Sequence, residues 1–363
     1  MVLASILALT STAQAYQIRT PASEPCHENI TLGALGAIGA PWSSPQAPDV
    51  SQALNVLLDK LDAVPNDQRT RAFIEDVAKR YNFQDTDLKR RYLLASFVAG
   101  VREPDTRGLS VVRFNNARET HLANETQAPH SLRRDFEDGD QGNAQALENI
   151  QDGMLERFEL ANERWQNGRL NRRIRWTMPH YGEIQPQVYS PAFDLGEMVH
   201  TLQDSYTHIL RHTDFSVLSV GNFIEAQDGT LDEARDGLGH SERMDQCNMD
   251  DEFDAGRVER ARQTTARWII DTVAAFEDPA AEAQLRATLA DVYLYRPGCN
   301  KSNDYCGTPW LKFARQDITQ PIQLWFCTLP REALPARSTG LGFLTALALL
   351  TGAIWLRRRS KRA

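Results

Sequence analysis

The sequence predicts a mainly α-helical domain, because helical periodicity recurs along the chain while strand-like alternation is scarce. Apolar residues repeat at steps of three and four in seven segments, at residues 50–63, 66–81, 85–99, 143–168, 191–212, 255–277 and 279–294. Period-two alternation is clearest at residues 109–114, where we expect a strand. Long polar segments separate the predicted helices, so we expect extended loops that carry functional residues.

The first residues of the chain predict an export signal. An apolar run at residues 2–9 is followed by the small-residue pattern Ala13-Gln14-Ala15, which predicts a signal peptide at residues 1–15. No basic residue precedes the apolar run, which departs from the usual pattern of such signals. Cleavage after Ala15 would make Tyr16 the first residue of the mature chain.

The last residues predict a membrane anchor. Residues 341–356 are apolar and uncharged, and the preceding small residues can extend this run towards the roughly 20 residues that span a bilayer. Residues 357–363 are strongly basic and should stay cytoplasmic, while residues 331–340 form a linker. The tail is also similar to sorting tails of bacterial surface proteins, so a retained and a cleaved anchor both fit. We therefore expect an exported, membrane-anchored protein whose main domain, residues 16–330, lies in the periplasm or at the cell surface.

The net charge limits the classes of partner, and the cysteine content indicates the cellular compartment. The net charge of −8 argues against a general nucleic-acid partner, which would require a basic face. Five cysteines in an exported chain predict disulfides with one cysteine left over. Cys299 and Cys306 flank a short polar loop and are a candidate local pair. Cys26 and Cys247 each lie near a histidine, so a bridge between them would tie two candidate site segments together, although other pairings remain open.

The segment 191–212 carries the most informative pattern, because His200, Asp204 and His208 recur at steps of four. On a helix this spacing places the three side chains within roughly 80° of arc on one face. Zinc binds imidazole nitrogen and carboxylate oxygen. Apolar neighbours on the same segment turn this face inward, where these polar groups would be costly without a cation. The pattern therefore predicts a metal site, with ordinary buried or surface histidines as the alternative.

Further candidate ligands lie in other segments of the chain. His27 follows Cys26, Asp105 lies in a turn after a predicted helix end, and His240 lies in the segment after the central helix. His130 is the candidate from the segment after the predicted strand, with His121 as its rival. If these loops fold onto the central helix, nitrogen and oxygen ligands from distant parts of the chain would enclose a cation.

The order of these residues resembles the superfamily of zinc-dependent phospholipases C and zinc-dependent single-strand nucleases. The central segment, Leu195-Gly196-Glu197-Met198-Val199-His200-Thr201-Leu202-Gln203-Asp204-Ser205-Tyr206-Thr207-His208, is most similar to the heterokaryon-incompatibility C group, whose members carry Leu-Gly-x-x-Leu-His-Thr-x-Gln-Asp-x-x-x-His. The resemblance covers residues 27–245 in motif order and implies a multi-helix phospholipase C-like domain. It implies metal binding by His27, Asp105, His130, His200, Asp204, His208 and His240.

The resemblance also implies particular roles, and the chain departs from it in places. Asp204 would bridge two ions, and Asp105 would be the catalytic residue that orients or deprotonates water. The family's mature N-terminal residue also binds metal and is usually Trp, whereas Tyr16 would stand there. The family's late histidine is followed four positions on by glutamate, where this chain has Met244, with Glu242 and Asp245 as imperfect substitutes. We therefore expect one to three zinc ions.

The function implied by the resemblance is hydrolysis of a phosphodiester. Membrane tethering favours a phospholipid substrate, whereas a nuclease, the enzymatic alternative, would require a basic or aromatic groove that the sequence does not indicate. The non-enzyme alternative is a surface or binding protein in which zinc is structural. The sequence contains no Gly-x-Ser-x-Gly elbow and no phosphate-binding glycine loop, which argues against a serine hydrolase or a nucleotide-binding protein. Nothing in the chain indicates an oligomeric state.

Overall fold

The computed structural model describes residues 25–43, 45–108, 121–178 and 182–318. The chain divides into two units, Met1–Pro321 and Ile322–Ala363, and every described residue belongs to the first. This unit is mainly helical, as the periodicity predicts. The predicted signal peptide, strand, linker, apolar tail and basic tail lie outside the described residues. Among the helices that are described, none combines the length and apolar character needed to cross a membrane.

The longer helices occupy the segments that the apolar periodicity predicts. Their bounds are α2 (Ser51–Lys60), α3 (Gln68–Arg80), α4 (Leu88–Thr106), α6 (Gly139–Gln166), α7 (Ser190–Asp204), α10 (Glu252–Glu277) and α11 (Glu282–Val292). Three of them start after an aspartate, Asp67, Asp87 or Asp251, whose carboxylate accepts a hydrogen bond from the backbone N–H three residues on. These bonds satisfy N–H groups that have no partner within the helix.

The shorter elements were not predicted. They are α1 (Cys26–Ala34), η1 (Asn124–Thr126), η2 (Ala128–His130), α8 (Ile224–Asp228), α9 (Glu233–Asp236), η3 (Pro279–Ala281), η4 (Lys301–Gly307), α12 (Leu311–Ala314), and the strands β1 (Asn171–Arg173), β2 (Trp176–Met178), β3 (Gly182–Ile184), β4 (Gln187–Tyr189), β5 (Ile209–Arg211) and β6 (Val217–Val220). The strands form three two-stranded antiparallel sheets, which pair β1 with β4, β2 with β3, and β5 with β6. Strands of three or four residues are too short to show a clear period of two.

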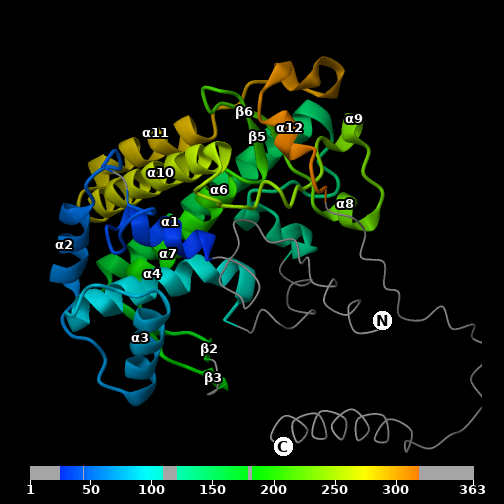
Figure 1. The fold of residues 1–363 in the computed structure, drawn as a ribbon. Coiled ribbons are helices and arrows are strands. Elements are labelled where there is room, and N and C mark those ends of the chain that lie inside the picture. The colour runs from blue at the N-terminus through cyan, green and yellow to red at the C-terminus, as the bar shows by residue number, and fades with distance from the viewer. Residues whose placement is uncertain (1–24, 44, 109–120, 179–181, 319–363) are drawn as a thin grey trace, which may run out of the picture. The chain divides into compact units, whose positions relative to one another are not determined.

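Helix α7 is the buried centre of this unit, since all 15 of its residues are buried. Helices α1, α4, α6 and α10 contact it, and α10 and α11 lie side by side (Figure 1). The most extensive helix–helix contact joins α4 to α7. The apolar residues beside His200 and Asp204 are therefore buried on every face of α7. For this reason the segment has no polar face exposed to solvent, unlike an amphipathic surface helix.

Two glycines allow α4 and α7 to approach closely. A Cβ atom at Gly100 would lie 2.0 Å from the backbone oxygen of Phe193, and one at Gly196 would lie 2.5 Å from the backbone oxygen of Phe97. Both distances are far below van der Waals contact, so only glycine fits at the crossing. The close approach brings the last turns of the two helices, with Asp105 and Asp204, into the same region.

Two predicted helix ends are wrong. Helix α4 does not stop at residue 99 but continues through Pro104 to Thr106, so Asp105 lies in its last turn and not in a turn after it. It ends where Arg107 adopts the left-handed conformation, at a φ of 47°. Helix α7 ends at Asp204 and not at residue 212. The hydroxyl of Ser205 donates to a backbone oxygen of the last turn, which competes with continued helix.

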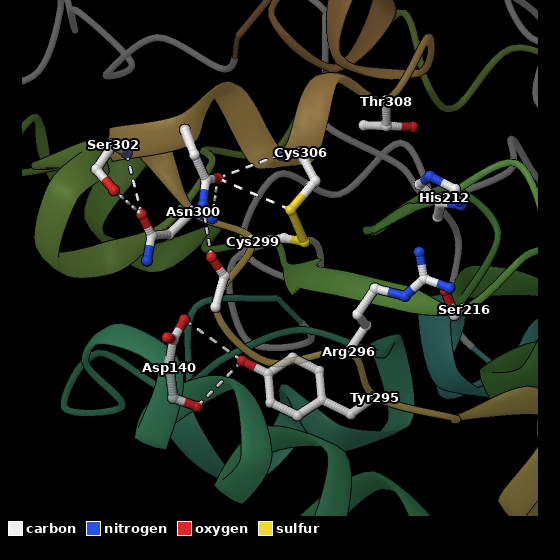
Figure 2. The surroundings of a disulfide bond; sticks show 12 residues. Asp140, His212, Ser216, Tyr295, Arg296, Cys299, Asn300, Ser302, Cys306 and Thr308 are labelled. Atoms are coloured by element: carbon white, nitrogen blue, oxygen red, sulfur yellow. Dashed lines mark hydrogen bonds between the residues drawn. A yellow bond between two sulfur atoms is a disulfide. The ribbon is translucent and has the colours of Figure 1, made fainter.

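The described disulfides are the two candidate pairs. Cys26–Cys247 joins α1 to the segment before α10, and Cys299–Cys306 closes the loop around η4. Figure 2 shows that loop, where the side chain of Asn300 accepts hydrogen bonds from Ser302 and where Tyr295, just before the loop, donates to Asp140 of α6. The Tyr295 bond attaches the segment before the loop to α6, whereas the Asn300 bonds lie within the loop. Cys327, the fifth cysteine, lies outside the described residues.

Candidate metal centre

Six histidines and three aspartates meet in one buried cluster near the C-terminal ends of α4 and α7. The nine side chains are His27, Asp105, His121, His130, His200, Asp204, His208, His240 and Asp245. None of them is more than 5% exposed. All seven residues predicted from the sequence are therefore brought together, although they come from segments up to 213 positions apart, from residue 27 to residue 240. His27, expected in a loop, instead lies in the first turn of α1.

The first group of ligands surrounds the carboxylate of Asp204. His27 Nε2 lies 3.0 Å from Asp204 Oδ1, while His200 Nε2 and His130 Nδ1 lie 3.0 and 3.1 Å from Asp204 Oδ2. Asp105 Oδ1 lies 3.8 Å from His130 Nδ1. Within this group, His27, His200 and Asp204 could hold one metal ion, and Asp105, His130 and His200 could hold another.

Hydrogen bonds on the far side of two imidazoles fix which nitrogen faces the carboxylate. His200 Nδ1 lies 2.8 Å from the backbone oxygen of Val101, and His27 Nδ1 lies 2.8 Å from Gln203 Oε1. Both partners are acceptors, so each Nδ1 carries the hydrogen, and each neutral ring presents a lone pair on Nε2. Two lone pairs then point at Asp204, an arrangement that requires a proton or a cation between them. Ligand histidines in metalloproteins are oriented by the same kind of outer hydrogen bond.

Three buried carboxylate oxygens have no hydrogen-bond donor. Asp105 Oδ2, Asp204 Oδ1 and Asp245 Oδ1 accept no hydrogen bond from the part of the chain that is described. A buried polar atom left in this state costs on the order of 1–3 kcal/mol, and more when it is charged. A divalent cation would satisfy these oxygens directly. The residues present therefore fit a metal ion in donor type, orientation and burial.

A second group lies beyond the end of α7. His208 Nε2 and His240 Nε2 are 3.0 Å apart, and Asp245 Oδ2 lies 3.2 Å from His240 Nε2. These three residues could hold a metal ion. The Nδ1 atom of His208 donates to the backbone oxygen of His130, which directs Nε2 towards His240 and Asp245. His208 is not on α7 as predicted, yet it still faces the cluster because its backbone N–H bonds to the oxygen of Asp204.

Two residues of the cluster, and a third that supports it, were not among the predicted ligands. His121 was only a rival to His130, but both lie in the cluster, their rings stacked 4.4 Å apart, and His121 Nε2 is 3.2 Å from Asp105 Oδ1. Asp245 was expected only as an imperfect substitute for a glutamate, but it lies in the cluster, with Oδ2 3.2 Å from His240 Nε2. Gln203 was not singled out, although its position before Asp204 in a buried segment was a usable signal.

The charged groups of the cluster shift one another's pKa values. Burial would raise the pKa of Asp204, but His200, His27 and His208 hold it well below its ordinary value. Burial would lower the pKa of His200, but Asp204 and Asp105 raise it to about 9. Burial, together with the positive potential of His121, lowers the pKa of His130 to about 4. In a chain stripped of metal, a proton on His200 would therefore take the place of the cation beside Asp204.

This shift predicts how metal affinity depends on pH. A histidine ligand must be neutral, so metal binding has to release the proton that His200 holds below pH 9. Between pH 7 and 9 this proton competes with the metal, so the dissociation constant should fall by up to about tenfold for each unit of rising pH. Titrations with a chromophoric chelator at several pH values would measure it. A dissociation constant that is flat from pH 7 to 9 would contradict the predicted protonation of His200.

Gln203 is expected to position His27. Its Oε1 accepts from His27 Nδ1, while its Nε2 donates to Thr31 Oγ1 at 2.9 Å and to Thr265 Oγ1 at 3.3 Å. Gln203→Leu removes the acceptor and should weaken metal binding by about 10–100-fold, the usual effect of losing an outer partner. Gln203→Glu keeps an acceptor for His27 and should restore most of the affinity. Equal affinities for the leucine variant and the wild type would show that His27 is oriented by other contacts.

Comparisons of this chain with protein-family models, with curated proteins and with solved structures give no match. Function therefore has to be inferred from the cluster and its surroundings.

Proposed function

We propose that this chain is a zinc-dependent phosphodiester hydrolase of the phospholipase C type, exported and tethered to a membrane. The observation that supports it is the cluster of six imidazoles and three carboxylates, with three carboxylate oxygens that lack donors. Mixed nitrogen and oxygen ligands are typical of zinc, whereas calcium and magnesium prefer oxygen alone. Two buried disulfide cysteines beside the cluster agree with an oxidising compartment, as expected for an exported protein.

The charge of the cluster favours two ions and an anionic substrate. Asp105, Asp204 and Asp245 contribute −3, and six neutral imidazoles contribute nothing. One divalent ion would leave a charge of −1, which repels a phosphodiester, whereas two would leave +1, which attracts it. Three ions would leave +3 in a buried site, which is costly without further anions. The two separate groups, one around Asp204 and one around His208, supply ligands for this number.

Different residues of the cluster would have different roles in hydrolysis. Zinc, when bound, polarises a phosphoryl oxygen and lowers the pKa of water towards about 7. Asp204 and the surrounding histidines would hold the first ion, and His208, His240 and Asp245 the second. Burial would raise the pKa of Asp105, but His200, His121 and His130 lower it below its ordinary value, so its carboxylate is a weak base. We therefore assign to Asp105 the orientation of water, with His121 beside it as a proton acceptor.

One observation favours a second candidate function. Every residue of the cluster is at least 95% buried, as expected for a structural metal site closed by protein ligands. In that case the chain would be a zinc-stabilised surface or binding protein. A nuclease is less well supported, since the net charge of −8 does not suit a nucleic-acid strand.

Hydrolysis assays on the full chain, purified in detergent, distinguish these functions. The zinc-loaded chain would be offered a choline phospholipid, a chromogenic aryl phosphodiester and single-stranded DNA. We expect hydrolysis of the phospholipid and the aryl diester, loss of activity on chelation and recovery on adding zinc. Cleavage of the DNA alone would favour the nuclease. Bound zinc without hydrolysis of any of the three would favour the structural role and overturn the proposal.

A further inference from the structure

We infer that the Cys26–Cys247 disulfide makes metal binding by the second group, His208, His240 and Asp245, depend on oxidation. This inference rests on the proposed metal-binding function and adds redox regulation to it. The disulfide links covalently the two chain segments that carry ligands of the two groups. Cys26 directly precedes His27 of the first group, and Cys247 follows Asp245 of the second group by two residues. One bond thus joins the backbones of two ligands that are 218 positions apart, from residue 27 to residue 245.

The two groups differ in what else holds them. In the first group, Asp105, His200 and Asp204 lie on α4 and α7, which are packed together at the glycine crossing. In the second group, His240 and Asp245 lie in the segment of residues 237–251, which contains no helix. The first group therefore keeps its geometry through the helical core, whereas the second depends on how its loop is attached.

Several attachments hold this loop near the cluster. At its start, the His240 N–H donates to the backbone oxygen of Asn222, and the Ser241 hydroxyl donates to the backbone oxygen of Gln316. Nearer to Asp245, the attachments are a guanidinium and the disulfide. The guanidinium of Arg257 on α10 donates to the backbone oxygens of Met244 at 2.6 Å and Gln246 at 2.9 Å, and to that of Tyr206 at 3.0 Å. The Cys26–Cys247 disulfide is the covalent attachment of this part of the loop, and both of its cysteines are at most 3% exposed. When the disulfide is absent, Arg257 still holds the loop close to α7. Reduction should therefore loosen Asp245, which lies two residues before Cys247, while His240 keeps its backbone hydrogen bond to Asn222 and the protein stays folded.

Forming the disulfide balances as an ordinary thiol–disulfide exchange. The thiols of Cys26 and Cys247 lose two protons and two electrons, and a disulfide-bearing oxidant takes them up and becomes a dithiol. In the reduced chain, metal binding by the second group would have to order the loop that carries Asp245. In the oxidised chain, the disulfide has already ordered this loop. Loss of such outer support usually weakens metal binding by about 10–100-fold. A chain still in a reducing compartment would thus fill only the first group, and the second would fill after export.

The test compares zinc affinity in oxidised and disulfide-free chains. Zinc would be titrated into the full chain against a chromophoric chelator, using the wild type and the double variant Cys26→Ser/Cys247→Ser. We expect two classes of site in the oxidised wild type. In the double variant the weaker class should lose at least about tenfold in affinity, while the tighter class changes less than about threefold. The matched control, Cys299→Ser/Cys306→Ser, removes the other disulfide and should leave both classes unchanged.

A second variant separates loosening of the loop from general unfolding. His240→Ala already disables the second group, so reduction with a phosphine should not change its remaining zinc affinity. Loss of all zinc from reduced His240→Ala would show that the disulfide supports the whole fold and would overturn the inference. Equal affinities in the oxidised wild type and the double serine variant would overturn it as well, and so would a single class of site in the oxidised wild type. If the oxidised wild type binds no zinc at all, it is the proposed function that fails.

Discussion

The Asp204→Asn variant is expected to lose metal binding by the first group and almost all hydrolysis. The Asp204 carboxylate contacts three imidazoles, those of His27, His130 and His200, at 3.0–3.1 Å. Asparagine has the same size but lacks the charge that attracts the cation. We expect zinc affinity to fall by more than about 100-fold, beyond the effect of losing an outer partner. Hydrolysis should fall by about 10³-fold or more, because a catalytic cation contributes several kcal/mol to the stabilisation of the transition state.

The asparagine variant should nevertheless fold. Its amide nitrogen can donate to an Nε2 lone pair of His27 or His200, which replaces the interaction that a proton or cation supplies in the wild type. Zinc content by mass spectrometry, hydrolysis rate and circular dichroism would be measured together. Asp59→Asn, on the exposed face of α2, is the matched control and should keep full zinc content. Full zinc content in Asp204→Asn would mean that Asp204 is not a ligand of the bound metal.

Removing the metal is expected to lower the thermal stability of the wild type strongly. Without a cation, the three carboxylates of the cluster remain buried, and their donor-free oxygens lose the partner proposed here. A ligand present at 1,000 times its dissociation constant stabilises the folded state by about 4 kcal/mol. For a domain of this size, such a change corresponds to a decrease of roughly 10 °C in the unfolding midpoint.

Differential scanning calorimetry with and without a chelator would measure this decrease. The chelator should have a clearly smaller effect on Asp204→Asn, which serves as the matched control because its first group already lacks metal. Zinc added back in excess should restore the midpoint of the wild type. An unchanged midpoint after complete removal of zinc would show that the cluster is stable by itself, as a network of imidazolium and carboxylate groups.

Local patterns in the sequence were enough to identify the centre of the candidate site. The spacing of His200 and Asp204 depends only on helical geometry, and both lie on α7 as predicted. The pairing of Cys26 with Cys247 was open from the sequence, yet the histidine near each cysteine indicated the pair that the structure contains. These predictions agree with the structure because they depend only on residues that are close together in the sequence.

Other parts of the site depend on contacts that no local pattern reveals. The close crossing of α4 and α7 requires Gly100 and Gly196, residues that helix propensity alone would count as unfavourable. Asp105 was expected in a turn after a helix, where aspartate is common, but the helix continues through Pro104 and includes it. His121 and Asp245 were named only as a rival and an imperfect substitute, because their burial in the cluster depends on the tertiary fold.

Metal analysis of the purified, oxidised full chain is the most direct test of whether the buried cluster is a metal centre. The predicted result is more than one zinc ion per folded chain, with the amount reduced in Asp204→Asn. A folded, oxidised chain that contains no divalent metal and takes up none from a zinc solution would contradict it.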